Sequence, residues 1–579
     1  MDDTPERPPK RPKLSQDLTQ ASEEPQLVTL HRSITPPPLS RTRRSITTTD
    51  AASPHDPKTS TTSPQNEKKP RTLPSPIHLT HIRDFSASSG NNVDCIRLSE
   101  ILGNPLIREC WQFNYLFDVD FLMRQFDADV RDLVSVKVVH GSWKRESEHR
   151  IRVDEACSRY SNVEPIVAYM PEPFGTHHSK MMILLRHDDT AQVIIHTANM
   201  IVGDWANMTQ AVWRSPLLPL SSADSNRGGS NDTPRPIPWG SGARFKRDIL
   251  AYLKEYGVKK TGPLVEQLAK YDFGAVRAAL IASVPSKLKV GNSGSSGNDE
   301  RTTWGWPALR DALRHVPLRE SDTTPHIIAQ MSSIASLGQT DKWLKDVFFD
   351  ALAPSSSRSP KQRPRYSIIF PTAEEIRRSL NGYGSGGSIH MKLQSAAQQK
   401  QLQYIKPYMF HWAGDVAGQL PPESRDAGRR RAAPHIKTYL RFTDARRMDG
   451  IDWALVTSAN LSTQAWGAAV NAGGEVRICS WEVGVLVWPE LFVADEDKKK
   501  KKKKKKEQGQ SVVMVPCFKQ DDPDTSRAVP RDEANNTALQ VGFRMPYDLP
   551  LTPYSAQDVP WCATLAHSQP DWLGQTWEG

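Results

Sequence analysis

The 579-residue sequence lacks long hydrophobic runs, an N-terminal apolar segment and paired cysteines. No stretch of about 18 apolar residues occurs, so we expect no membrane span. The N-terminus has no apolar core of the kind found in secretory signal peptides, so no signal peptide is expected. Six cysteines are scattered without a CxxC pair, which argues against a disulfide framework or a zinc site and fits a reducing compartment. The length allows two or three domains.

The body of the chain also lacks a net positive charge, although the formal net charge of the whole sequence is +10. Nine of these charges come from the lysine run 498–506, and residues 1–80 add three more, with 12 Lys/Arg against 9 Asp/Glu. The remaining residues therefore carry a net charge of −2, so binding of a polyanion would need a local basic groove. We expect the lysine run to be a solvated, self-repelling loop. The alternative is a non-specific tether to nucleic acid.

Residues 1–80 are rich in Pro, Ser and Thr and poor in apolar residues. They cannot bury enough surface to offset the entropy of ordering, so we expect a disordered tail and a folded part that starts near His81. The cluster Lys10-Arg11-Pro12-Lys13 resembles a nuclear-import signal and predicts a nuclear protein. The alternative is an incidental basic patch.

Apolar runs of strand length alternate with helical patterns in two similar halves. Expected strands cover 135–140, 181–185 and 193–195 in the first half and 438–442 and 453–456 in the second, with a helix over 244–256. This pattern predicts an α/β fold of two similar domains with mixed sheets flanked by helices. Segments 221–238, 291–300 and 354–364 look like insertions or linkers. We place the domain boundary in the Gly/Ser-rich middle one, which gives domains 81–295 and 296–579.

A short pattern occurs once in each half. In each copy, a His and a Lys two residues apart precede an apolar run, and an Asn follows the next apolar run. The residues are His178, Lys180 and Asn199 in the first copy and His435, Lys437 and Asn460 in the second. Alternation along a strand points the His and the Lys to the same side. Two copies with matching surroundings predict two half-sites that face each other across a pseudo-two-fold axis.

These residue types suit phosphoryl transfer. One imidazole can attack phosphorus and form a phosphohistidine, while the other protonates the leaving oxygen and then activates water. The ammonium and amide groups can neutralise the phosphate oxygens. No carboxylate cluster is spaced like a metal site, so we expect no metal and no cofactor.

The doubled His-x-Lys…Asn pattern resembles the phospholipase D superfamily. The usual motif continues with an Asp five residues after the Lys, where this sequence has Leu185 and Phe442. In lacking this Asp, the sequence resembles one branch of the superfamily, the tyrosyl-DNA phosphodiesterases. Segments 174–182, 204–210, 457–467, 482–486 and 546–550 resemble this branch as well.

The resemblance implies residue roles. His178 would be the nucleophile and His435 the general acid and then base, while Lys180, Lys437, Asn199 and Asn460 would bind phosphate. Gln210 and Glu482 would orient the histidines, with the pairing left open. Phe174 would stack on a base. The DNA backbone would be contacted by four serines, Ser332, Ser333, Ser336 and Ser462. The family tends to have Gly at the position of Ala335, so a backbone amide contact is less expected there.

The resemblance further implies a nuclear DNA-repair phosphodiesterase without metal or cofactor. Its substrates would be single- or double-stranded DNA with a 3′-phosphotyrosyl end left by a trapped topoisomerase I, whose peptide is the leaving group, and other 3′-blocked ends. A site complete in one chain favours a monomer that does not bind membranes. The alternatives are a lipid phosphodiesterase of the same superfamily and a catalytically silent scaffold that binds DNA ends.

Overall fold

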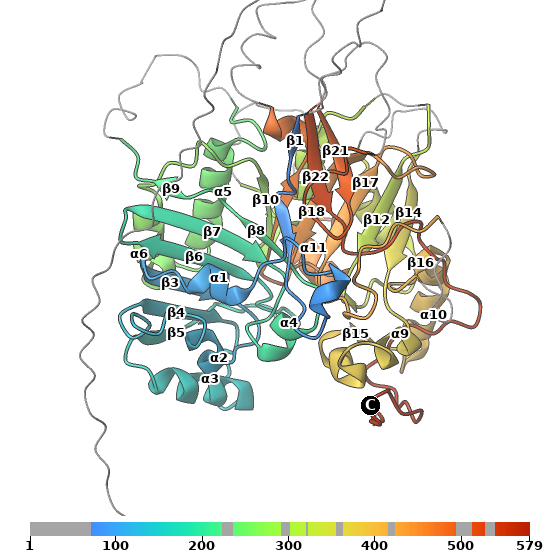
Figure 1. Ribbon diagram of the computed structural model, residues 1–579, viewed down its shortest axis with the longest axis horizontal. Coiled ribbons are helices and arrows are strands. Elements are labelled where there is room, and N and C mark those ends of the chain that lie inside the picture. Colours follow the sequence, from blue (N-terminus) through green and yellow to red (C-terminus); the bar gives the residue numbers. More distant parts are fainter. Residues whose placement is uncertain are drawn as a thin grey trace, which may run out of the picture. The chain divides into compact units, whose positions relative to one another are not determined.

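The computed structural model describes residues 71–222, 236–290, 302–319, 322–354, 363–414, 423–493, 512–526 and 539–579 (Figure 1). The basic cluster at 10–13, the segment 291–300 and the lysine run lie outside these residues, as do most of the tail and most of the other two insertions.

The first sheet has eight strands in the order β2-β8-β7-β6-β3-β4-β5, with β9 paired to β7. In chain order its strands are β2 (Ile77–Leu79), β3 (Ile107–Phe113), β4 (Ser135–His140), β5 (Val163–Val167), β6 (Met181–Arg186), β7 (Thr190–His196), β8 (Ala211–Arg214) and β9 (Leu218–Pro219). The continuous apolar run of β6 is buried because helices cover both faces of the sheet (Figure 1).

One face of this sheet packs against α1 (Leu98–Leu102), α2 (Val119–Met123) and α3 (Glu148–Ser158). The other face packs against α5 (Gly242–Lys254) and α6 (Val258–Leu268), while the short α4 (Val202–Ala206) follows β7. Helix α5 forms where the 3.6-residue period predicts it. Its hydroxyl cap Ser241 accepts from the Arg244 amide at 3.2 Å, and Phe245, Ile249, Tyr252 and Leu253 are buried on one stripe.

The second sheet has ten strands, in the order β1-β22-β21-β18-β17-β12-β14-β16, with β20 joined to β18 and β10 joined to β20. Its strands are β1 (Thr72–Leu73), β10 (Ala279–Ser283), β12 (His326–Gln330), β14 (Arg365–Ile369), β16 (Met409–Phe410), β17 (Thr438–Phe442), β18 (Ile451–Thr457), β20 (Glu482–Val487), β21 (Val512–Cys517) and β22 (Leu539–Arg544). Two small ladders complete the strands: β11 (Ser286–Lys289) with β19 (Glu475–Ile478), and β13 (Ser333–Ile334) with β15 (His390–Met391).

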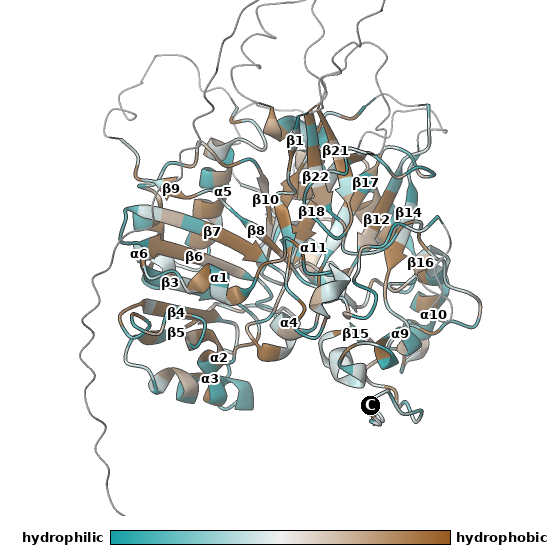
Figure 2. Ribbon diagram, in the orientation of Figure 1, coloured by the Kyte–Doolittle hydropathy of each residue, from teal (hydrophilic) through white to brown (hydrophobic). Residues whose placement is uncertain are grey.

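The helical elements of the second half are α7 (Gly305–Arg314), the π-helix η3 (Trp343–Phe349), α8 (Asp350–Leu352), α9 (Ala373–Arg377), the 3₁₀-helix η5 (Gly382–Ser388), α10 (Ala396–Ile405) and α11 (Thr463–Trp466). The strands of both sheets are predominantly hydrophobic (Figure 2). One continuous core contains side chains from both sheets, including Ile183 and Val193 from the first and Leu455 and Val485 from the second. Among the described residues, no helix combines the length and the hydropathy needed to cross a bilayer.

Seven strands of the first sheet repeat seven strands of the second. The order β2-β8-β7-β6-β3-β4-β5 corresponds to β10-β20-β18-β17-β12-β14-β16, and every neighbouring pair is antiparallel up to β3 and β12 and parallel beyond them. The expected α/β fold of two similar halves with mixed sheets is confirmed. In each half, the His-x-Lys motif lies directly before the middle strand, β6 or β17.

The strand pairing starts each half of the fold at an earlier residue than the sequence analysis expected. The first repeat begins with β2 and not near His81, so the expectation of disorder is wrong for 71–80, which hold β1 and β2. The second repeat begins with β10, before the boundary placed at 295. Both missed elements are edge strands of the repeat next to prolines, at Pro76 and Pro285, and such composition hides a strand.

Candidate active site

Each His-x-Lys motif pairs through its backbone with a segment of the opposite half. The His178 amide donates to the Trp481 carbonyl at 2.9 Å, directly before Glu482. The His435 amide donates to the Thr209 carbonyl at 3.2 Å, directly before Gln210. The two motifs and the two predicted orienting residues therefore meet at the junction of the sheets.

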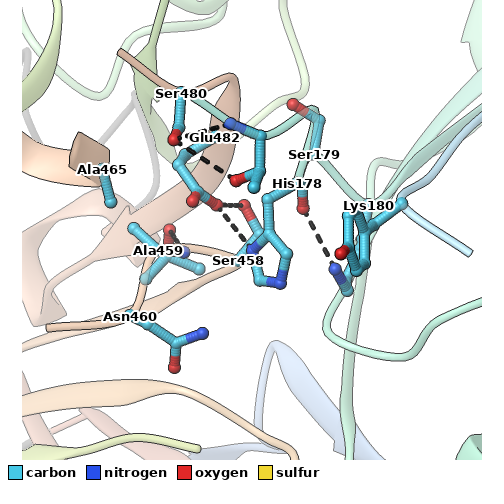
Figure 3. Close-up of polar contacts among 12 residues, drawn as sticks. His178, Ser179, Lys180, Ser458, Ala459, Asn460, Ala465, Ser480 and Glu482 are labelled. Atoms are coloured by element: carbon cyan, nitrogen blue, oxygen red, sulfur yellow. Dashed lines mark hydrogen bonds and ion pairs between the residues drawn. The ribbon is translucent and has the colours of Figure 1, made fainter. Parts of the chain in front are cut away.

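His178 is held by a carboxylate from the second half (Figure 3). Its Nδ1 lies 3.0 Å from Glu482 Oε2, and the Ser458 hydroxyl donates to the same oxygen at 2.5 Å. Since the carboxylate can only accept, it fixes the proton of the neutral imidazole on Nδ1 and leaves Nε2 with a free lone pair.

His435 is held by two residues of the first half. Its Nδ1 lies 3.1 Å from Gln210 Nε2 and 3.3 Å from Gln210 Oε1. The carboxylate oxygen Oδ2 of Asp204 is also 3.1 Å from this nitrogen. The pairing that the sequence left open is thus crosswise: Glu482 contacts His178, and Gln210 contacts His435.

A hydroxyl two residues before each Asn supports the orienting side chain. Thr197 Oγ1 donates to Gln210 Oε1 at 2.8 Å and accepts from the Ala211 amide at 2.9 Å. Ser458 Oγ is bonded equivalently to Glu482 and to the Val483 amide, at 2.5 and 3.0 Å. The sequence analysis gave these hydroxyls no role, although a Thr or Ser in the same place of both copies was the available signal.

The two lysines are completely buried and lie close to the histidines. Lys180 Nζ donates to the His178 carbonyl at 3.1 Å, and Lys437 Nζ donates to the His435 carbonyl at 2.6 Å. Burial lowers the pKa of Lys180 to about 8. Burial, followed by the charge of Lys180, lowers the pKa of Lys437 well below its usual value. Two buried lysines, one of which lowers the pKa of the other through its charge, are a site prepared for an anion.

The histidine rings titrate below their usual range. Burial first, and then the charge of Lys180, lowers the pKa of His178 to about 4, although Glu482 opposes this shift. Burial and Lys437 lower the pKa of His435 well below its usual value. Both imidazoles are therefore neutral at pH 7 in the free protein, which is the state that a nucleophile requires.

The two asparagines differ in how they are held. The side-chain oxygen of Asn460 accepts from the Ser332 and Ser333 amides at 3.1 and 2.9 Å, so its amide nitrogen remains available to donate. The backbone amide of Asn199 donates to Asp204 at 2.7 Å, while its buried Oδ1 has no hydrogen-bond partner among the described residues.

The predicted DNA contacts fall into two groups. Phe174, with 80% of its surface exposed, Ser336 and the half-buried Ser333 are accessible. Ser332 is buried, and its hydroxyl donates to Asn460 at 3.3 Å. Ser462 is also buried, and its hydroxyl accepts from the Ala465 amide as the cap of α11. The hydroxyls of these last two thus serve the site's own framework.

Two further residues at the site had no assigned role. Asp204 lies beside His435, accepts from the Ser388 hydroxyl at 3.1 Å and has its pKa raised by burial. The ring of Tyr115 lies 5.7 Å from the His178 ring and 6.0 Å from Lys180 Nζ. Neither belongs to a repeated pattern, so the comparison of the two copies could not find them.

The positions where an Asp is usual in the superfamily are occupied by core residues. Leu185 lies inside β6 and Phe442 at the end of β17, and neither side chain is exposed. An ionised carboxylate there would need a buried partner. The carboxylate that contacts His178 is that of Glu482, at the start of β20.

The duplicated fold brings two imidazoles and two buried lysines together in one site, which is the arrangement of a phosphodiesterase with a doubled His-x-Lys motif. The chain belongs to the tyrosyl-DNA phosphodiesterase family, because the family model described as tyrosyl-DNA phosphodiesterase matches residues 76–555. The chain is therefore a hydrolase that acts on phosphodiester bonds.

Individual relatives agree with this assignment. The chain is 30% identical over 571 residues to a probable tyrosyl-DNA phosphodiesterase of Schizosaccharomyces pombe, over 88% of this chain and 97% of the relative. It is 29% identical over 504 residues to tyrosyl-DNA phosphodiesterase 1 of Drosophila melanogaster, over 85% of this chain and 74% of the relative. A crystal structure of the yeast tyrosyl-DNA phosphodiesterase shares the fold, with a TM-score of 0.56 at 22% identity over 84% of this chain and 98% of that one.

Proposed function

We propose that this protein is a nuclear DNA-repair enzyme that hydrolyses the bond between a 3′-phosphate of DNA and a tyrosine. The leaving group would be a peptide derived from a trapped topoisomerase I, and other 3′-blocking groups would be secondary substrates. The observation that carries the proposal is the pair of oriented imidazoles beside two buried ammonium groups, His178 with Lys180 and His435 with Lys437. This arrangement provides a nucleophile, a proton donor and a phosphate clamp without further groups.

In the first step, His178 Nε2 attacks phosphorus while Glu482 holds the Nδ1 proton. The bond from phosphorus to the tyrosine oxygen breaks, and His435 transfers a proton to that oxygen. His435 is neutral in the free protein, so the incoming phosphate must supply the negative charge that raises its pKa. The Asp204 carboxylate, 3.1 Å from Nδ1, favours the same protonated state.

In the second step, the neutral His435 removes a proton from water. The resulting hydroxide attacks phosphorus, the bond from phosphorus to His178 breaks, and DNA with a 3′-phosphate is released. Lys180, Lys437 and the two asparagines would hold the non-bridging oxygens through both steps.

The test is incubation with a 3′-phosphotyrosyl oligonucleotide in EDTA, alongside phosphatidylcholine vesicles. We expect 3′-phosphate DNA to be released as fast in EDTA as in its absence. Full loss of activity in EDTA that Mg²⁺ or Zn²⁺ restores would refute the metal-free mechanism. Hydrolysis of the lipid alone would favour the lipid phosphodiesterase, and binding of the oligonucleotide without release would favour the silent scaffold.

The pKa values of the site predict a bell-shaped pH dependence of kcat/KM. Lys180 and Lys437 must both be charged to bind phosphate, so activity should fall as the pH rises, at the latest through about 8, where the Lys180 ammonium loses its proton. His178 must be neutral to attack, so activity should fall as the pH drops through about 4. Because bound phosphate stabilises the ammonium form, the alkaline limb of kcat should lie at higher pH than that of kcat/KM. A kcat/KM that keeps rising above pH 9 would contradict this assignment.

Phe174→Ala should weaken binding of DNA without slowing the chemical step. Loss of stacking on one base costs about 1–3 kcal/mol, so we expect KM to rise roughly 10-fold at an unchanged kcat. The control is Val258→Ala, because Val258 on α6 is equally exposed at 82%. A minimal substrate without a stackable base should be turned over normally. Equal slowing on that substrate would mean that Phe174 shapes the site and does not hold DNA.

Localisation and oligomeric state belong to the same proposal. The basic cluster at 10–13 would direct nuclear import, and the four catalytic His and Lys side chains come from one chain, which supports a monomer. Ser333 and Ser336, with their accessible positions, would be the serine contacts to the DNA backbone.

A further inference from the structure

A cavity of about 370 Å³ lies in the second half of the fold, outside the active site. Three of its lining residues come from the second sheet: Tyr366 of β14, Arg441 of β17 and Trp453 of β18. Ile327 of β12 pairs with both Tyr366 and Arg441, and Arg441 in turn pairs with Trp453. The four side chains therefore form one row on a single face of the sheet. Other lining residues belong to α7, η3 and α8.

The cavity shares no residue with the active site. Its lining contains none of the site's histidines, lysines and asparagines, and none of the side chains that support them. Lys437 stands directly before β17, and Arg441 follows four positions later. At about 3.3 Å per residue along a strand, the two residues are roughly 13 Å apart.

The first half has an apolar row in the equivalent place. Cys110 of β3 pairs with both Val136 of β4 and Leu184 of β6, and Leu184 follows the motif lysine by four positions, as Arg441 does in the second half. All three side chains are buried in a hydrophobic core. The repeated sheet is thus complete with a leucine at this position. A buried guanidinium in its place costs free energy of desolvation, so packing alone does not account for Arg441.

Arg441 is buried but keeps hydrogen-bond donors for a ligand. Its Nε donates to Asp452 at 2.8 Å, and the same carboxylate accepts from the Thr443 hydroxyl at 2.8 Å. Among the residues that the structure describes, none accepts from the two Nη groups of Arg441. Because this side chain is only 9% exposed and lines the cavity, its Nη groups can donate to an anion bound there.

The charges around the cavity leave a positive excess. Its charged lining residues are Lys345, Arg363, Arg441 and Asp350. Lys345 pairs with Asp341 at 2.5 Å, and Asp350 pairs with Arg310 at 3.3 Å. With these partners and Asp452 counted, four cations face three carboxylates. One positive charge therefore remains for a ligand of opposite sign.

Aromatic rings form a second part of the lining. Phe349 stacks on Tyr366 with ring centroids 3.9 Å apart and planes at 7°, and Tyr408 meets Phe349 edge-on at 5.4 Å. The Tyr366 hydroxyl donates to the Phe349 carbonyl at 3.0 Å, which fixes this pair further. A rigid aromatic wall beside a guanidinium suits a flat ring that carries an anionic group.

We propose that this cavity binds a nucleoside monophosphate, with the phosphate on Arg441 and the base against Tyr366 and Tyr408. Its volume lies in the range of small-ligand sites, about 300–1,000 Å³. Asp350 Oδ1, the oxygen that does not contact Arg310, can accept from an exocyclic amine. That acceptor favours adenine, guanine or cytosine over uracil or thymine. The inference is independent of the proposed function, because the two sites have no residue in common.

Isothermal titration of the full-length protein with adenosine 5′-monophosphate tests the proposal. Arg441→Gln keeps a donor for Asp452 but removes the charge, so we expect the Kd to rise at least about 10-fold. Ala353→Trp, at a half-buried lining position, should fill the cavity and abolish binding without touching the ion pair. Adenosine and inorganic phosphate should each bind at least about 10-fold more weakly than the nucleotide, because each offers only one of its two parts.

Two variants serve as controls. Arg365→Gln removes an exposed charge next to Tyr366 that does not line the cavity, and Lys180→Met removes an ammonium of the active site. Both should leave the Kd unchanged, and thermal unfolding of all variants should show an intact fold.

Several results would overturn the proposal. One is the absence of binding to the unmodified protein up to about 1 mM nucleotide. Another is a loss of binding in Lys180→Met that Arg441→Gln does not share, because it would place the anion in the active site. Inorganic phosphate that binds as tightly as the nucleotide would remove the role of the base. If Arg441→Gln unfolds, undiminished binding in Ala353→Trp overturns the proposal by itself.

Discussion

His178→Ala is expected to abolish turnover and to leave no covalent protein–DNA species. Without His178, no imidazole among the described residues contacts Glu482, so the proposed attack on phosphorus has no nucleophile. Removing the nucleophile of a well-studied triad costs on the order of 10⁶ in kcat, and we expect a loss of at least about 10³-fold here. Single-turnover assays with a labelled 3′-phosphotyrosyl oligonucleotide, resolved on denaturing gels, measure both turnover and the adduct.

The control is His315→Ala, an exposed histidine at the end of α7, which should turn over normally. Equal thermal unfolding of the two variants would show that the fold is intact. Turnover in His178→Ala above about one tenth of the normal rate would exclude His178 as the nucleophile.

His435→Asn should separate the two chemical steps. A phenolate leaves with little protonation, so the covalent species should still form, whereas water needs a base to attack it. Loss of that base should slow hydrolysis of the adduct by roughly 10²–10⁴-fold, and a protein–DNA species should accumulate. It should be labile to acid, as expected of a phosphoramidate.

An alkyl leaving group at the 3′-phosphate provides the comparison for this variant. An alkoxide needs a proton to leave, so His435→Asn should form the adduct slowly with this substrate and accumulate little of it. If the adduct builds up in His178→Ala and not in His435→Asn, the roles of the two histidines are reversed.

The sequence could predict those parts of the molecule that appear twice. The His-x-Lys motifs and the strands that follow them are recognisable because each copy supports the other, and β17 has the predicted bounds. Residues that occur once had no such support. Asp204 reaches His435 only because α4 folds back beside the second motif, a contact of segments 231 residues apart in sequence.

The starting points of the repeats were missed for a different physical reason. β2 and β10 are edge strands of the repeat, and their pairing depends on β8 and β20 far along the chain. Pro76 stands directly before β2, so the composition there resembles that of the tail, whereas β10 is an apolar run that lies before the boundary at 295. The Gly/Ser-rich segment at 291–300, where the boundary was placed, follows β10 in the chain, so this boundary lies after the first strand of the second repeat.

Because His178 of the first half is held by Glu482 of the second half, the proposed reaction requires synthesis of the chain to pass Glu482. A growing chain that has emerged only as far as β14 presents His178 without Glu482, so its nucleophile is not yet aimed. His435 is synthesised before Glu482. Gln210, which contacts His435, belongs to the first half and is synthesised earlier still. Under the proposed mechanism, acid–base competence would precede nucleophilic competence, and a truncated product would not trap DNA in an adduct that it is unable to resolve. Chains that end before Glu482 should accordingly yield no labelled adduct with the 3′-phosphotyrosyl oligonucleotide.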